Sequence, residues 1–138
     1  MQVIFAVSDA QRAAAFYEAV FGWPRNTRID YANYVELHPD AGGTLGLYER
    51  PGFAGEVGAE PVEVPPTQLS PAYLYVRVDD VEAAAARLEE AGAQPLSGLA
   101  DRSWGERAAW FADPDPDRGR SGCRYRRIVL RASMEALA

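Results

Sequence analysis

Apolar residues occupy every second position at the start of the chain, and the same pattern returns about seventy residues later. The apolar positions of the two segments are Val3, Phe5, Val7, Leu74, Val76 and Val78. A period of two is typical of a strand that buries one face. Apolar residues at helical spacing and then a glycine follow each segment. The sequence therefore predicts the same strand–helix unit twice.

The two predicted helices have recognisable start and stop signals. Asp9 is placed to cap the first helix, which ends at Gly22. In the second helix, Asp79 and Glu82 have the spacing of a capping box, and Gly92 ends the helical pattern. Each helix is thus expected to follow its strand directly and to stop after about three turns.

Three strand candidates follow each helix: Trp23–Ile29, Tyr31–His38 and Thr44–Arg50 in the first half, and Gln94–Leu99, Glu106–Ala112 and Arg124–Ala132 in the second. Residues 51–70 are rich in proline, glycine and acidic side chains, which favours a linker. We therefore expect an α+β fold with a first βαβββ module at 1–50, a linker at 51–70 and a second βαβββ module at 71–138, within one structural domain.

Composition narrows the class of protein. The chain has 138 residues, 48% hydrophobic and 25% charged, which is typical of one globular domain. Its net charge is −6, which argues against a nucleic-acid partner. The one cysteine, Cys123, rules out a disulfide framework, and we read it as a reduced thiol. With neither a leader peptide nor a stretch of membrane-spanning length, we expect a cytoplasmic protein that does not enter a membrane.

All basic residues are arginines, and they crowd the C-terminal segment at Arg118, Arg120, Arg124, Arg126, Arg127 and Arg131. We interpret this segment as a solvated basic strand. A phosphate or carboxylate site is the alternative.

Several motifs indicate a family. In the first half they are Val7-Ser8-Asp9 and the run from Phe16 to Trp23; in the second they are the runs from Tyr75 to Val81 and from Trp110 to Asp115. With these motifs the chain resembles the vicinal oxygen chelate superfamily, which includes glyoxalase I, extradiol dioxygenases and bleomycin-resistance proteins. The resemblance implies two tandem βαβββ modules whose mixed sheets curl around a shared cavity, often in a homodimer. The reaction stays open, because this fold hosts unrelated chemistries.

The resemblance also implies positions for a divalent metal, and these positions carry unsuitable residues. One ligand comes from the first strand of each module, seven residues before the capping aspartate, and here these are Gln2 and Tyr73. Glu49 is the nearest carboxylate on the last strand of the first half, and the final strand offers none. We interpret His38 as a turn residue. We therefore expect a cavity with neither metal nor cofactor.

Strand alternation places a different set of side chains in that cavity. If Val3, Phe5 and Val7 pack under the first helix, then Gln2, Ile4 and Ala6 face the cavity, and so do Tyr73, Tyr75 and Arg77 from the second half. Trp104 lies in a predicted loop and is a candidate for ligand stacking or for a dimer contact, with Tyr31 and Trp110 as further aromatic candidates. The alternative is that these rings simply fill the core. The predicted ligand-binding residues are Gln2, Ile4, Tyr73, Tyr75, Arg77, Trp104 and Trp110.

These observations predict a metal-independent small-molecule-binding protein of the bleomycin-resistance kind, which sequesters an aromatic or drug-like ligand and so confers antibiotic resistance. No nucleophile–base pair stands out; Glu49, Asp79, Glu106 and His38 are the titratable candidates, and we assign no catalytic residue. One alternative is a divalent-metal glyoxalase, dioxygenase or thiol transferase in which Gln2, His38 and Glu49 converge. Another is a vestigial cavity in a protein that acts through its dimer surface, with residues 51–70 exchanged.

Overall fold

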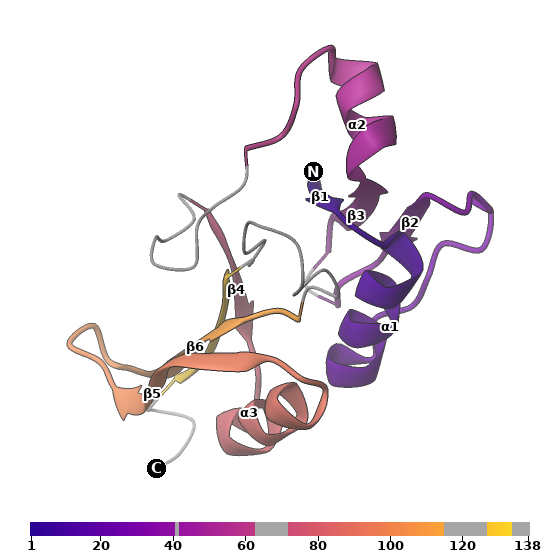
Figure 1. Cartoon of the computed structure of the whole chain (residues 1–138). Coiled ribbons are helices and arrows are strands. Elements are labelled where there is room, and N and C mark those ends of the chain that lie inside the picture. The colour runs from indigo at the N-terminus through magenta and orange to yellow at the C-terminus, as the bar shows by residue number, and fades with distance from the viewer. Residues whose placement is uncertain (41, 63–71, 115–126, 134–138) are drawn as a thin grey trace. The chain divides into compact units, whose positions relative to one another are not determined.

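The structure is a computed structural model that describes residues 1–40, 42–62, 72–114 and 127–133, the last of these for the backbone alone. Two compact units divide the chain. The described part of one lies within Met1–Glu63, and the described parts of the other lie within Val64–Pro114 and Gly122–Ala138. Figure 1 labels most of their helices and strands.

The first unit holds a three-stranded sheet and two helices: β1 (Gln2–Val7), α1 (Ala10–Phe21), β2 (Tyr34–Leu37), β3 (Thr44–Glu49) and α2 (Arg50–Val57). The strand order is β1-β3-β2, with β1 parallel and β2 antiparallel to β3. As predicted, Asp9 caps α1, because its Oδ1 accepts from the backbone N–H of Arg12 at 2.9 Å. Gly22, at φ 68°, ends the helix in the left-handed conformation that glycine adopts without strain.

The core of this unit lies between α1 and one face of the sheet. Its fully buried side chains include Tyr17, Val7, Leu37, Leu45 and Leu47. Val7 shares its face with Phe5 and Val3, as the period of two predicts, although Val3 at the start of β1 is 42% exposed. Gln2, Ile4 and Ala6 point to the opposite face.

One strand expectation for this unit is wrong, and one helix was not expected. Residues 23–29 form no strand. Trp23 instead stacks on Tyr17, with ring centroids 6.1 Å apart, and Arg25 makes an isolated bridge to Leu37. Helix α2 occupies the start of the expected linker, because Pro51 lies in the first helical turn, where its missing N–H costs nothing.

The second unit has one helix and a four-stranded sheet: β4 (Tyr73–Arg77), α3 (Val81–Glu90), β5 (Gln94–Asp101), β6 (Glu106–Ala112) and β7 (Arg127–Ser133). Its elements follow the predicted order strand, helix and three strands. The strand order is β4-β7-β6-β5, with β4 parallel to β7 and the other pairs antiparallel. β6 has the predicted bounds, whereas β5 runs on to Asp101 and β7 ends at Ser133.

The cap of α3 differs from the capping box that the spacing of Asp79 and Glu82 predicts, and agrees with the capping aspartate counted seven residues after Tyr73. Asp80, not Asp79, is the N-cap residue, and its Oδ1 accepts from the backbone N–H of Ala83 at 3.0 Å. The helix buries Val81, Ala84 and Leu88. The capping-box spacing from Asp79 to Glu82 therefore places the start of the helix one residue too early. Asp80 has the same spacing to the backbone N–H of Ala83, which it caps.

The described residues thus form an α+β protein with three helices and two mixed sheets, which confirms the α+β part of the predicted fold class. The tandem βαβββ arrangement stays a prediction, since the described first sheet has three strands. The shared cavity stays a prediction, and so do the domain boundaries. No helix in the described ranges is long and apolar enough to span a membrane. Cys123 and the side chains of the C-terminal arginines lie outside the described residues.

Candidate functional site

One face of the second sheet carries half-exposed aromatic rings. Tyr73 and Tyr75 alternate along β4 with the less exposed Leu74 and Val76. The tyrosine side chains are 54% and 38% exposed, and their ring centroids lie 6.3 Å apart at an angle of 51°. Large rings are usually buried more fully than this. The two tyrosines therefore present apolar surface together with polar hydroxyl ends.

A single carboxylate holds two of the rings on this face in place. Glu106, the first residue of β6, accepts a 2.7 Å hydrogen bond from the hydroxyl of Tyr75. The same oxygen, Oε2, accepts from the indole Nε1 of Trp104 at 2.9 Å. The Glu106 side chain is only 13% exposed. Because hydrogen bonds to a carboxylate are stronger than neutral ones, Glu106 orients both rings.

Arg77 adds an exposed cation beside this carboxylate. Its Nη2 lies 3.9 Å from Oε1 of Glu106, and its side chain is 64% exposed. That distance makes an ion pair but is longer than a hydrogen bond. The contact contributes little to stability, because water screens it.

Trp104 and Trp110 extend the aromatic surface along the β5–β6 hairpin. Their rings pack edge to face with centroids 6.1 Å apart. The guanidinium of Arg102 lies 4.8 Å from the centroid of Trp110 and donates to the carbonyl oxygens of Gly98 and Ala108. Arg102 thereby links β5 to β6 where their pairing is irregular, and its guanidinium lies against the ring of Trp110.

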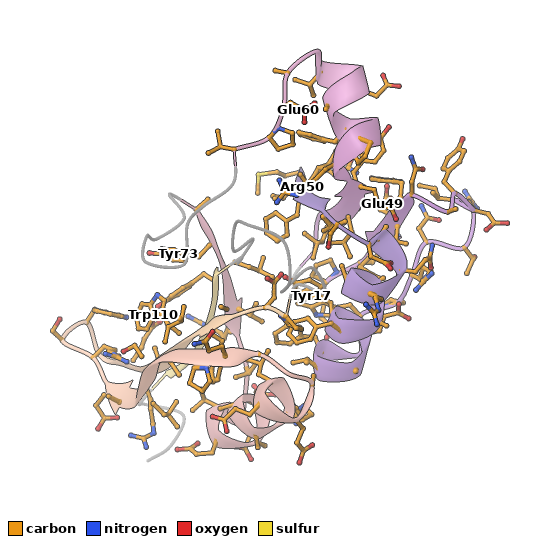
Figure 2. All side chains as sticks on the ribbon, in the orientation of Figure 1. Tyr17, Glu49, Arg50, Glu60, Tyr73 and Trp110 are labelled. Atoms are coloured by element: carbon orange, nitrogen blue, oxygen red, sulfur yellow. The ribbon has the colours of Figure 1, made fainter. Side chains whose placement is uncertain are left out.

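We call Tyr73, Tyr75, Arg77, Trp104, Glu106 and Trp110 the aromatic face. Figure 2 labels two of its members, Tyr73 and Trp110, which lie in the second unit. The sequence predicted all of these residues except Glu106 as ligand-binding, and the structure brings them onto one unit. Glu106 had been considered only as an acid–base candidate, because sequence spacing does not reveal its two donors.

The first unit has a polar group on the sheet face that α1 leaves uncovered. The Gln2 amide donates to the hydroxyl of Tyr34 at 2.6 Å and to Glu36 Oε2 at 3.3 Å. Tyr34 donates to the same oxygen at 3.0 Å, and Asn26 donates to Oε1 at 3.1 Å. We call Gln2, Asn26, Tyr34 and Glu36 the polar cluster. Its carboxylate has donors on both oxygens.

Burial, and then the hydrogen bond to Glu36 and the charge of that carboxylate, together raise the pKa of Tyr34 from its ordinary 10.0 to about 12, against a lowering by the hydrogen bond from Gln2. Tyr34 therefore stays a protonated donor at neutral pH. Gly46 makes room for it, because a Cβ there would lie 2.7 Å from the Tyr34 hydroxyl and 3.1 Å from Ile4.

The structure thus separates the predicted residues into two groups. Gln2 belongs to the polar cluster, and Ile4 lies half-exposed on the same face, whereas Tyr31 is exposed outside both groups. Tyr34 and Glu36 were missed. Their alternation with the buried Val35 and Leu37 is a period-two signal that could have identified the face they share.

The residues that the structure describes do not fit the metal site that the resemblance implies. Glu49 lies on the helix side of the first sheet, where its Oε2 accepts from the backbone N–H of Ala10 at 3.1 Å (labelled in Figure 2). Gln2 points to the other face and is engaged with Tyr34 and Glu36. In the described ranges, no three histidine, cysteine or acidic side chains gather in a way that could hold a metal ion.

Comparison with solved structures supports the fold. A glyoxalase/bleomycin resistance protein/dioxygenase family enzyme from Burkholderia phytofirmans PsJN matches with a TM-score of 0.75 at 17% identity, over 96% of each chain. A glyoxalase-related enzyme from Fulvimarina pelagi matches with a TM-score of 0.77 at 18% identity, over 96% of this chain and 86% of the other. Fosfomycin resistance protein FosX from Mesorhizobium loti matches with a TM-score of 0.64 at 15% identity, over 100% of this chain and 96% of the other. These similarities concern the fold alone.

No curated protein sequence matches the chain significantly. A family model matches residues 2–116, which covers both the motifs of the first half and those of the second. The chain therefore belongs to the Glyoxalase/Bleomycin resistance protein/Dioxygenase superfamily.

Proposed function

We propose that this protein is a metal-independent binding protein that sequesters a small aromatic, drug-like molecule against the aromatic face. The observation that carries the proposal is the double hydrogen bond to Glu106. It holds the rings of Tyr75 and Trp104 in fixed orientations while leaving much of their surface exposed. Rings that are ordered before binding lose less conformational entropy when a ligand stacks on them.

The size of the exposed rings sets the strength of the expected effect. A large aromatic side chain buries roughly 150–250 Å² when fully covered. Covering the exposed half of one ring therefore contributes about 2 kcal/mol, at roughly 25 cal/mol per Å². Removing a stacking ring should weaken binding by about tenfold to thirtyfold.

The proposal extends to resistance against a toxic compound, in a cytoplasmic homodimer. FosX from Mesorhizobium loti, which shares the fold, is by its name a fosfomycin resistance protein. Superfamily membership is compatible with either a binding protein or an enzyme. Gln2 and Glu49 lie on opposite faces of the first sheet and are engaged there, which leads us to prefer the binding protein.

A thermal-shift screen of the purified protein tests this function. The probes are Mg²⁺, Mn²⁺, Ni²⁺ and Zn²⁺, and two neutral aromatic compounds, 2-naphthamide and quinoxaline-2-carboxamide. We expect saturable stabilisation by an aromatic probe, since a ligand that binds only the folded state raises its stability by RT ln(1 + [L]/Kd). Stabilisation by a metal ion alone would overturn the proposal and favour an enzyme.

Calorimetric titrations of variants then locate the site. Tyr73→Ala and Trp104→Ala should each weaken binding of the aromatic probe by about tenfold or more. Trp104→Phe retains a ring and should recover part of the loss. Val57→Ala is the control, because Val57 on α2 is an exposed apolar side chain of the other unit. Unchanged affinity in both alanine variants would contradict stacking on the aromatic face.

A further inference from the structure

Arg77 is the most exposed charged group of the aromatic face. It lies on β4 two residues after Tyr75, so the two side chains leave the strand on the same side. The ion pair with Glu106 is 3.9 Å long and holds the guanidinium loosely. A guanidinium has five N–H donors in a planar fork that matches a carboxylate. Arg77 is therefore placed to donate to an anion while a ring covers the tyrosines.

Glu106 does not offer an equivalent site for a cation. Its side chain is 13% exposed, and its Oε2 already accepts from Tyr75 and Trp104. A cation at this oxygen would have to displace those donors and release both rings, and a cation at Oε1 would meet the guanidinium of Arg77, whose Nη2 lies 3.9 Å away. The carboxylate of Glu106 therefore orients the rings of Tyr75 and Trp104, and the charge that is exposed to a ligand is that of Arg77.

The sheet adds arginine positions at this place. In the backbone register of β4 and β7, Arg127 pairs with Tyr73 and Arg131 pairs with Arg77. The chain as a whole carries a net charge of −6, which favours cations at long range. At physiological ionic strength, however, charges more than about 8 Å away are largely screened, so the exposed charge of Arg77 itself decides.

We infer that the ligand of the aromatic face is a planar aromatic acid whose carboxylate is bound by Arg77 while its ring stacks on Tyr73, Tyr75 or Trp104. This inference rests on the proposed function and names its ligand class. The carboxylate accepts two parallel N–H bonds from the guanidinium, and the ring covers the half-exposed aromatic surface. Both contacts are needed for full affinity.

A matched pair of probes separates the two contacts. 2-Naphthoate and 2-naphthamide have the same ring, and only the first is an anion. By titration calorimetry at physiological ionic strength, we expect 2-naphthoate to bind about tenfold or more tightly than 2-naphthamide. Arg77→Gln should weaken the binding of 2-naphthoate by about tenfold and change the affinity for 2-naphthamide by no more than about twofold. Arg77→Lys should restore part of the loss, because the charge returns without the fork.

Arg12→Gln is the control, since Arg12 is an exposed arginine of α1 and its loss changes the net charge equally. It should leave both affinities unchanged. Thermal unfolding of Arg77→Gln checks that the variant folds, which its exposure favours. Equal binding of the two probes, or an equal effect of Arg77→Gln on both, would overturn the inference and leave the proposed function standing. Binding of neither probe would overturn both.

Discussion

The hydroxyl of Tyr75 on β4 lies 2.7 Å from Oε2 of Glu106 on β6, although β7 separates these two strands in the sheet. In the register of the sheet, Tyr75 lies opposite Val129 of β7, whereas Glu106 lies opposite Ser133, so the hydrogen bond also bridges a stagger along the strands. Long side chains from the two flanking strands thus meet over the middle strand. The contact ties the edge strand β4 to β6 independently of the backbone ladder.

Tyr75→Phe tests this tie. The variant keeps the ring and removes the donor, so we expect the free energy of unfolding to fall by about 0.5–1.5 kcal/mol in denaturant titrations. Tyr73→Phe is the matched control, because Tyr73 lies on the same strand and face with its ring more exposed. A loss of the same size in both variants would show that the bond to Glu106 contributes nothing of its own.

Gly46→Ala should destabilise the first unit. The new Cβ would lie 2.7 Å from the hydroxyl of Tyr34, which is held by Gln2 and Glu36 and cannot move without breaking those bonds. We expect a loss of about 1–3 kcal/mol, the usual cost of overpacking. Gly98→Ala on β5 is the control, since its Cβ would meet nothing within 4 Å. Full stability of Gly46→Ala in chemical denaturation would contradict the described packing.

The free energy of unfolding should fall at alkaline pH because Tyr34 loses its proton. Its pKa is raised from 10.0 to about 12, so between these values the folded state binds more protons than the unfolded state. The stabilisation is therefore complete below pH 10 and is lost as the pH rises towards 12. Tyr34→Phe removes this dependence.

Absorbance titration of the tyrosinates measures that pKa directly. The wild type should show a late-titrating phenol that is missing from Tyr34→Phe. Glu36→Gln removes the charge and should bring the phenol back towards its ordinary range. If Tyr34→Phe instead lost a phenol that titrates in the ordinary range, the raised pKa of Tyr34 would be refuted.

The start of α3 can be tested with neighbouring aspartates. Asp80→Ala removes the acceptor for the backbone N–H of Ala83 and should cost about 1 kcal/mol. Asp79→Ala removes an exposed side chain outside the cap and should have a much smaller effect. Thermal unfolding of the two variants decides between the cap in the structure and the capping box suggested by spacing. A larger loss in Asp79→Ala would favour the latter.

Much of the local structure could be predicted from the sequence. The period of two places Val7 and Gln2 on opposite faces of β1, β6 has the bounds predicted for it, and Asp9 caps α1. These features depend on residues a few positions apart, whose steric and hydrogen-bonding preferences act within one element. Helix α2 was missed because proline and glycine are typical both of linkers and of helix ends.

The partners of each functional side chain depended on tertiary structure. Strand alternation predicted that Tyr73, Tyr75 and Arg77 share a face, but not that Glu106, 31 residues from Tyr75, would orient the ring. Likewise Gln2 meets Tyr34 across 32 residues, because β3 brings β1 and β2 into one sheet. A sequence determines which face of a strand each side chain leaves from. Only the order and register of the strands decide which of those side chains meet, since these follow from the packing of the whole unit.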